Sequence, residues 1–321
     1  MRYLRIVILL VVGIASSHMA WGQGYPNKPV RIVVPFAAGS ATDIVARLLA
    51  DELRVAFNQN FIVDNKPGAS AQIGAEHVAK ATPDGYTLFV TTNTSHSANP
   101  FLFKKLPYDP IKDFAPVAGI MNIPVIVVVD PKLPINSMQD LVAYAKARPG
   151  KVSFGYGNSI GQVVGASFAK SAGIEVVSVP YKSSPQAMTD VMGGQVSYGV
   201  TDMAAGQSLV KAGKLRAIGV SSEKRSPLMP DLPAISEAPG LSGFDVIAWI
   251  AMFAPAGTPK EIVDRLSVEV RKALAKPEIK ERLIQFAGEV TPSTPDQLAA
   301  FVRAQLASWG KRIKEAGIEP E

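Results

Sequence analysis

The chain has 321 residues and a formal net charge of +6, with 47% hydrophobic and 19% charged residues. This length suffices for two α/β lobes, and the composition excludes a disordered protein. The chain contains no cysteine, which excludes disulfides and thiolate chemistry, and its three histidines (His18, His77 and His96) lack metal-ligand spacing. We therefore expect no metal and no other cofactor. Lysines and arginines are scattered along the chain, which argues against nucleic-acid binding.

Residues 1–22 have the three-part pattern of a secretory signal peptide. Two arginines open the segment, the apolar stretch 6–15 follows, and small residues precede a cut ahead of Gln23. A membrane anchor would need roughly twenty apolar residues, and the unbroken apolar stretch has about ten. We expect a mature, monomeric protein that begins near Gln23 and is exported to the periplasm.

Short β-type segments alternate with amphipathic helices along the mature chain, which is typical of parallel α/β sheets. Strands are expected at 30–35, 87–92, 125–129, 153–155, 176–179, 196–200, 215–220 and 246–254. Helices are expected at 42–57, 137–147 and 162–172, and three more begin near Pro259, Pro277 and Pro295. Breaks at 122–124 and before Phe244 predict a first lobe at 23–124 plus 245–321 and a second at 125–244. Two crossings between lobes leave a cleft that can close on a ligand.

Three loops follow predicted strands, at the sheet edge where ligands bind in parallel α/β proteins. The first, 35–43, combines small residues with a helix start that offers free N–H groups. The second, 91–97, has seven consecutive small or polar residues, and the third, 155–162, is rich in Gly, Asn and Ser. Tight turns, helix caps and solvated loops would explain the same residues. None of these loops contains Lys or Arg, and the nearest base is Lys182, so neutral donors and helix dipoles would have to hold an anion.

Enzyme motifs are missing from the sequence. There is no G-x-S-x-G or P-loop motif, and the G-x-G at 155–157 lacks the third glycine of a dinucleotide-binding loop. Ser95 and His96 are adjacent in sequence, which is not in itself a catalytic geometry. Asp202 follows a predicted strand and is expected to be a hydrogen-bond partner of the ligand or a loop anchor. We expect a binding protein rather than an enzyme.

A series of short motifs runs in order along the mature chain. They include VVPF at 33–36, NKPGA at 65–69, PDGYTL at 83–88, LPYDP at 106–110, VPYK at 179–182, GGQV at 193–196, AGKLRA at 212–217 and APAGTP at 254–259. The series resembles the Bug-type (TctC-like) solute receptors of tripartite tricarboxylate transporters. The resemblance implies a type II periplasmic-binding-protein fold, with two lobes around a ligand cleft.

The resemblance also implies a small carboxylate ligand, such as a dicarboxylate or an aromatic acid, and the membrane subunits of a transporter as partners. A sensing role that reports to a membrane sensor kinase stays open as the alternative. The first and third loops would grip the carboxylate through Phe36, Ala38, Gly39, Ser40, Thr42, Asp43, Gly157, Asn158, Ser159 and Gln162. His96 and Asp202 match further family positions, and Asn93, Ser95 and Tyr181 complete the predicted site. The family commonly has Gly in place of Ser40 and His in place of Gln162, which puts its usual ligand in doubt here.

Overall fold

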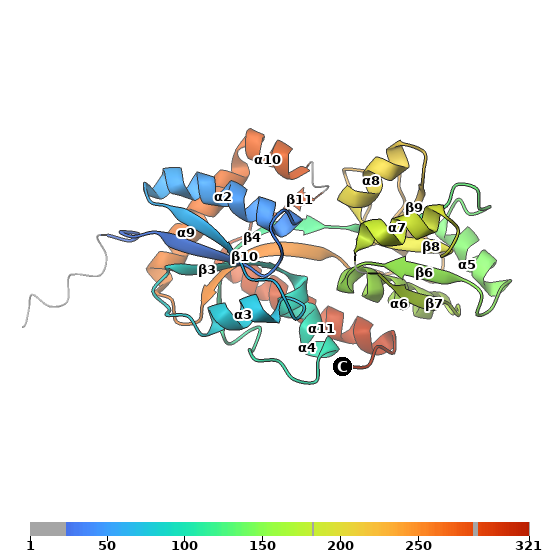
Figure 1. Ribbon diagram of the computed structural model, residues 1–321, viewed down its shortest axis with the longest axis horizontal. Helices are drawn as coiled ribbons and strands as arrows, with labels where there is room; N and C mark the ends of the chain where they lie inside the picture. Colours follow the sequence, from blue (N-terminus) through green and yellow to red (C-terminus); the bar gives the residue numbers. More distant parts are fainter. Residues whose placement is uncertain (1–23, 182, 285–287, 321) are drawn as a thin grey trace, which may run out of the picture.

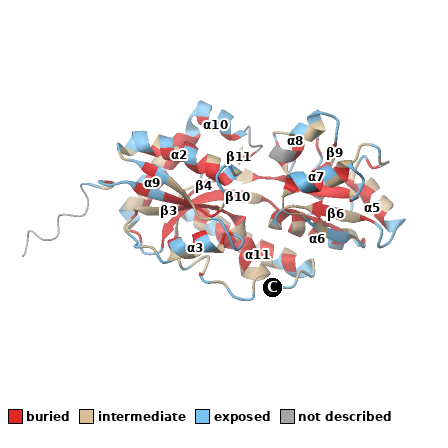
Figure 2. Ribbon diagram, viewed as in Figure 1, coloured by how far each residue is buried: buried red, intermediate tan, exposed pale blue. Residues whose placement is uncertain are grey.

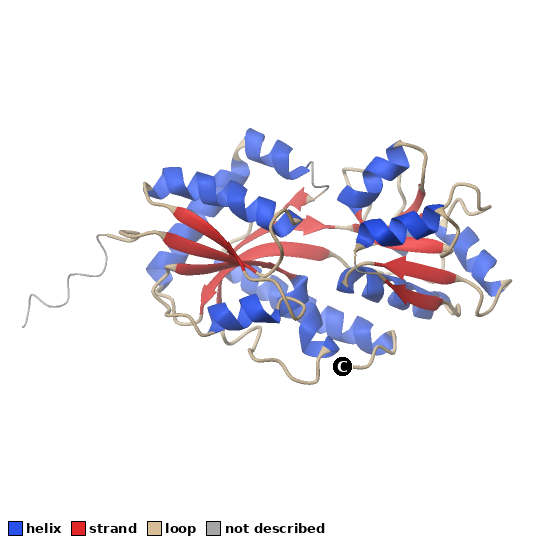
Figure 3. Cartoon of the chain, viewed as in Figure 1, coloured by secondary structure: helices blue, strands red, loops and turns tan. Residues whose placement is uncertain are grey.

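The computed structural model describes residues 24–181, 183–284 and 288–320, so the predicted signal peptide lies outside the described residues. The first sheet contains β1 (Val30–Val34), β2 (Phe61–Asn65), β3 (Thr87–Thr92), β4 (Phe114–Ile123), β10 (Ala248–Pro255) and β11 (Glu289–Val290). The second contains β5 (Val125–Val129), β6 (Ser153–Tyr156), β7 (Val177–Pro180), β8 (Tyr198–Asp202) and β9 (Arg216–Val220). The strand orders are β11-β4-β10-β3-β1-β2 and β7-β6-β8-β5-β9. Two lobes side by side result, each with its own sheet, which confirms the predicted two-lobed α/β architecture (Figure 1, Figure 3).

Helices cover both faces of each sheet, and most of the strand residues are buried beneath them (Figure 2). The first lobe carries α2 (Ala41–Phe57), α3 (Gln72–Ala79), the π-helix η2 (Thr94–Ala98), α4 (Asn99–Leu102), α9 (Lys260–Ala275), α10 (Pro277–Ile284) and α11 (Pro295–Glu315). The second carries α5 (Met138–Lys146), α6 (Ser159–Ala172), α7 (Ser184–Met192), α8 (Met203–Lys211) and the short 3₁₀ turn η3 (Ile235–Glu237).

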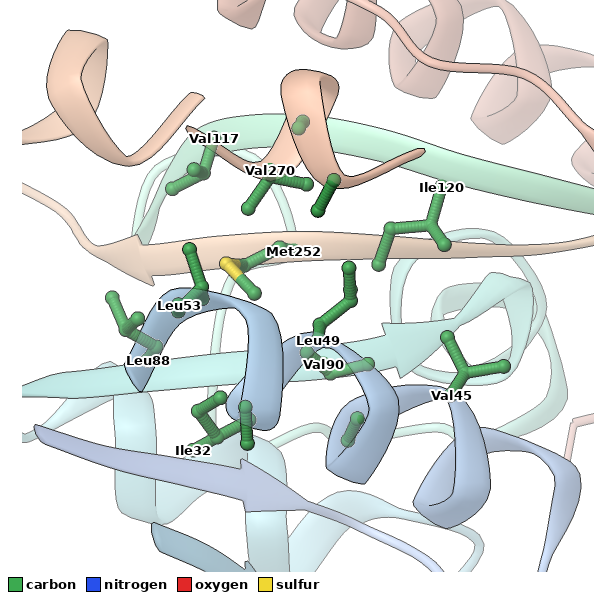
Figure 4. Close-up of a cluster of buried hydrophobic side chains, with 14 of the residues drawn as sticks. Ile32, Val45, Leu49, Leu53, Leu88, Val90, Val117, Ile120, Met252 and Val270 are labelled. Atoms are coloured by element: carbon green, nitrogen blue, oxygen red, sulfur yellow. The ribbon is translucent and has the colours of Figure 1, made fainter. Parts of the chain in front are cut away.

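Aliphatic side chains fix α2 against the first sheet. Val45, Leu49 and Leu53 recur at helical spacing along α2 and are fully buried. They pack against strand residues such as Ile32 and Leu88 in one continuous cluster (Figure 4). This packing holds the N-terminus of α2 in a fixed place at the end of β1.

Two of the segments that connect the lobes, which contain Val125 and Val246, lie side by side. Ser221 connects them, because its N–H donates to the carbonyl of Val125 at 2.9 Å and its carbonyl accepts from the N–H of Val246 at 3.0 Å. In the first lobe, Thr92 at the end of β3 pairs with Ile250 of the crossing strand β10. In the second lobe, Asp202 at the end of β8 pairs with Val125. The carboxyl ends of the parallel strands β1–β3 and β6–β8 therefore lie at the edges where the two lobes meet.

The last long helix, α11, belongs to the hydrophobic cores of both lobes. Leu298 and Val302 pack in the first lobe, whereas Trp309 and Ile313 join the cluster that contains Phe168 of α6. The boundaries between lobes proposed from the sequence, which place 245–321 wholly in the first lobe, stay a prediction.

Several sequence-based expectations need correction. The sheets are mixed rather than parallel, because β4, β5 and β10 run antiparallel to their neighbours. β2 and α3 were not predicted. The strand expected at 196–200 lies at 198–202, so Asp202 is its last residue. α6 begins at Ser159 instead of Gln162, because Asn158 already caps it. The second loop is not an open loop, because 94–98 form the buried π-helix η2.

Candidate functional site

The first loop ends in a well-capped helix start. Ala38 and Gly39 are exposed and Phe36 is half-buried. The hydroxyl of Ser40 accepts a hydrogen bond from the N–H of Asp43 at 3.2 Å and so caps α2. Thr42, in the first turn of α2, is buried.

Asp43 anchors the first loop from inside the lobe. Its buried carboxylate accepts hydrogen bonds from the Gly39 N–H at 2.8 Å, from Asn65 Nδ2 at 2.9 Å and from Arg47 Nε at 3.0 Å. Asn65 also donates to the carbonyl of Phe36 at 3.0 Å, so the end of β2 is tied to the same loop. Because these donors occupy the Asp43 carboxylate, its role in the site is to shape the loop.

We expect Asp43→Asn to lower the free energy of unfolding by about 1–3 kcal/mol, because a buried charged acceptor is lost. Burial opposes ionisation of Asp43, but the hydrogen bonds from Arg47, Gly39 and Asn65 outweigh burial and lower its pKa. The stabilisation is therefore complete above the unfolded-state pKa of about 4 and is lost as the pH falls through the lower folded-state pKa. Denaturant unfolding at pH 7 and pH 3 measures both effects.

Asp64→Asn is the matched control, because Asp64 pairs with Arg31 and Lys66 nearer the surface. We expect it to cost under about 1 kcal/mol at pH 7. An equal loss in both variants would contradict the anchoring role of Asp43.

The residues predicted from the second loop are buried. Ser95 and His96 are fully buried and Asn93 is 2% exposed. The Ser95 hydroxyl lies 2.7 Å from Thr91 Oγ1 and 2.9 Å from His96 Nδ1, and the imidazole stacks on Phe253 with 4.1 Å between ring centroids. Burial lowers the pKa of His96 to about 3, so the ring is neutral. The Ser95–His96 contact is therefore part of the core, out of reach of a substrate in this conformation.

The third loop opens α6. The Asn158 side chain accepts from the N–H of Gly161 at 2.9 Å, and Ser159 lies in the first helical turn. Gly157 is pressed against the start of α7: a Cβ added there would lie 2.0 Å from Ser184 N. The starts of α6 and α7 are thus brought together at one edge of the second sheet. Gln162 lines a surface groove of about 610 Å³ between α6 and the chain end at 316–319.

Tyr181 directly follows β7 and Asp202 ends β8, and these two strands lie on either side of β6. The Tyr181 hydroxyl donates to Asp190 Oδ2 at 2.7 Å, and burial together with this carboxylate raises the pKa of Tyr181 to about 12. Asp202 ends β8, half-buried, opposite Val125 at the crossing. Lys182 lies outside the described residues.

The exposed parts of the site are therefore two helix starts on facing lobes. The backbone N–H groups at positions 41, 42, 159 and 160 have no protein partner within the described ranges. Helix N-termini with free N–H groups attract anions, which makes the starts of α2 and α6 candidate positions for a carboxylate. The same ranges contain no group of three His, Asp or Glu side chains that could hold a metal ion.

Sequence reasoning missed Arg47 and Asn65, which position Asp43 and the first loop. It also missed Asn99, a fully buried residue that donates from Nδ2 to the carbonyl of Ser70 at 2.8 Å. These residues act through contacts between distant segments, so no local motif identifies them. The Pro67-Gly68 pair is the one local signal in this region, and it indicates a turn directly after Asn65 and Lys66.

A family model described as the tripartite tricarboxylate transporter family receptor matches residues 45–318. A UPF0065 protein of Bordetella bronchiseptica is 37% identical over 324 residues, covering 98% of this chain and 94% of the relative. The structure resembles that of an R. palustris protein solved with adipate, with a TM-score of 0.83, 35% identity and coverage of 93% of this chain and 100% of that one. It also resembles the periplasmic binding protein BugD, with a TM-score of 0.78, 35% identity and coverage of 92% and 100%.

Proposed function

Since the chain belongs to the receptor family of the tripartite tricarboxylate transporters, we propose that it captures a small carboxylate in the periplasm and presents it to the membrane subunits of such a transporter. The observation that carries the proposal is the pair of free helix starts, α2 and α6, at the facing edges of the two lobes. The adipate bound to the R. palustris relative and the periplasmic place of BugD support the same ligand class and location. Within the described residues, no helix is long and apolar enough to cross a membrane.

In the proposed site, neutral hydrogen-bond donors hold the carboxylate. Backbone N–H groups in the first turns of α2 and α6, with the hydroxyls of Ser40 and Ser159 and the amide of Asn158, would surround one carboxylate. The described parts of the first and third loops contain no Lys or Arg. Neutral donors and helix dipoles bind an anion without a strong point charge, which suits a receptor that must release its ligand.

Calorimetric titration of the mature protein with adipate tests the proposal. Ser40→Ala and Ser159→Ala are each expected to weaken binding by about tenfold or more, since a hydrogen bond to a charged group contributes roughly 1.5–3 kcal/mol.

Ser137→Ala is the matched control. Ser137 caps α5 in the same way that Ser40 caps α2, because its hydroxyl accepts from the N–H of Asp140 at 3.1 Å, but it belongs to a different helix of the second lobe. It should lose stability without losing affinity. Unchanged binding in Ser40→Ala and Ser159→Ala would rule out these hydroxyls as ligands. Absence of binding to every member of a panel of aliphatic and aromatic mono- and dicarboxylates would overturn the proposed function.

A further inference from the structure

The end of the second lobe that lies farthest from the first lobe is formed by strand ends and helix ends. Val129, the last residue of β5, pairs with Tyr198 at the start of β8 and with Arg216 at the start of β9. β6 and β7 begin in the same place, because Ser153 pairs with Val177. α5 lies at this outer end of the lobe (Figure 1). We call the segments 130–152, 170–176, 193–197 and 211–216 the distal end.

The distal end carries the whole excess of positive charge of the predicted mature chain. The chain has 33 Lys or Arg and 27 Asp or Glu residues, and Arg2 and Arg5 belong to the predicted signal peptide, so the mature chain has a net charge of +4. Eight of the cations and three of the acids lie in the distal end, which gives it a net charge of +5. Cations that are scattered along the sequence are therefore gathered at one end of the folded protein.

Most of these cations are exposed and unpaired. Within the described residues the ion pairs lie elsewhere, as in Lys276–Glu52 and Lys260–Asp264 of the first lobe. The eighth cation, Arg216, is half-buried and donates to the carbonyl of Ile135 at 3.0 Å. The exposed cations without an ion pair in the described ranges are Lys132, Lys146, Arg148, Lys151, Lys170, Lys211 and Lys214.

The acidic side chains of the distal end do not neutralise these cations. The Asp130 carboxylate accepts from the N–H of Lys132 at 2.9 Å, and the Asp140 carboxylate accepts from the N–H of Asn136 at 2.9 Å. Both carboxylates therefore hold turns of their own segments. Glu175, the third acid, is exposed and forms no ion pair within the described ranges.

Helix dipoles explain only part of this charge. Lys146, Lys170 and Lys211 lie in the last turns of α5, α6 and α8, where a cation is favourable.

Three further lysines lie outside the helices. The side chains of Lys132, Lys151 and Lys214 have no hydrogen-bond or ion-pair partner within the described ranges. The stability of the lobe therefore does not account for them.

The composition of the distal end fits a lipid surface better than a protein partner. Protein interfaces have an apolar, often aromatic core from which lysine is depleted. Among the large apolar side chains that are exposed in the described residues, only Val177 lies near the distal end. Tyr144, the aromatic residue of these segments, is covered by the Arg148 guanidinium, 3.9 Å from its ring centroid. Flexible, exposed lysines without an apolar core suit a layer of lipid phosphate groups.

We propose that the distal end of the second lobe binds to an anionic membrane surface through the phosphate groups of its lipids. Ammonium and guanidinium groups donate to phosphate oxygens, and each cation close to such a surface adds to the attraction. The inference goes beyond the proposed function, because it uses no residue of the carboxylate site. For a transporter receptor, this attachment would keep the protein close to the membrane subunits.

Co-sedimentation of the mature protein with lipid vesicles tests the inference. The wild type should bind vesicles made of equal parts phosphatidylglycerol and phosphatidylcholine, and it should not bind vesicles of phosphatidylcholine alone. Raising the salt concentration from about 10 mM to about 150 mM shortens the Debye length from about 30 Å to about 8 Å and should release most of the bound protein.

The triple variant Lys132→Gln, Lys151→Gln, Lys214→Gln removes the cations that have no local role. One cation near an anionic surface contributes roughly a fivefold gain in affinity, so the variant should bind the phosphatidylglycerol vesicles about a hundredfold more weakly. Its melting temperature and its adipate affinity should equal those of the wild type, which shows that the protein is folded.

The triple variant Lys104→Gln, Lys105→Gln, Lys280→Gln is the matched control. It removes the same charge from exposed lysines of the first lobe that have no ion pair in the described ranges. It should bind the vesicles like the wild type.

Absence of wild-type binding to the phosphatidylglycerol vesicles, or an equal loss in the two triple variants, would overturn the inference. Displacement of the protein from the vesicles by soluble polyglutamate at an equal concentration of charges would also overturn it, because an acidic protein would then be the better partner. Failure to bind adipate or any other carboxylate would count against the proposed function alone.

Discussion

Replacing Gly157 by alanine is expected to abolish carboxylate binding and to lower the melting temperature by several degrees. An added Cβ would lie 2.0 Å from Ser184 N and 2.1 Å from the carbonyl carbon of Ser183. Both are backbone atoms, so no side-chain rotation removes the overlap, and the start of α7 must move away from the start of α6. Overpacking of this kind costs about 1–3 kcal/mol or more. Calorimetry with adipate and thermal unfolding measure the two effects.

Two other glycines serve as controls. Gly193 has φ of −82° and its nearest atom to an added Cβ is Thr189 O at 3.4 Å, so Gly193→Ala should change neither property. Gly39 has φ of 82° but nothing within 4 Å of an added Cβ, so in thermal unfolding Gly39→Ala should show only the cost of backbone strain, about 1 kcal/mol. Normal binding by Gly157→Ala would show that the α6–α7 junction is not part of the site.

His96→Phe is expected to make the protein less sensitive to acid. His96 is neutral in the core, with its pKa lowered by burial to about 3, whereas an unfolded histidine has a pKa of about 6.5. Below pH 6.5 the histidine is protonated in the unfolded chain but not in the folded protein. The free energy of unfolding therefore falls by about 1.4 kcal/mol per pH unit. Between pH 6.5 and pH 5 the wild type should lose about 2 kcal/mol more than the variant.

Phenylalanine is chosen because the imidazole packs among the rings of Phe89, Phe114 and Phe253. Denaturant unfolding at the two pH values provides the measurement. His77→Gln is the control, because His77 is exposed. This variant should show most of the wild type's loss in free energy of unfolding between pH 6.5 and pH 5. A variant with the same acid sensitivity as the wild type would mean that His96 is protonated in the folded protein.

The sequence predicted those parts of the fold that local periodicity determines. Val45, Leu49 and Leu53 indicated α2 because a helix brings residues at this spacing onto one face. β2 gave no such indication, since its residues after Phe61 are exposed or half-buried at the sheet edge. The antiparallel direction of β5 and β10 depends on pairing between segments far apart in the chain, which composition does not reveal.

The sequence also predicted some parts of the candidate site and not others. The sequence predicted both helices but placed their starts at 42 and 162, whereas α2 begins at Ala41 after the Ser40 cap and α6 begins at Ser159 after the Asn158 cap. The burial of Ser95 and His96 does not follow, because a polar segment is ordinarily expected in solvent, and here hydroxyl contacts and aromatic stacking offset its desolvation.

The sharing of α11 between the two cores has a consequence for biosynthesis. Trp309 and Ile313 complete the cluster around Phe168, yet the ribosome makes them long after the strands of that sheet. The part of the second lobe's core that Trp309 and Ile313 cover stays incomplete until α11 has emerged, so this lobe is finished only when the last helix is in place. A chain arranged in this way should complete its last packing step only after its synthesis has ended.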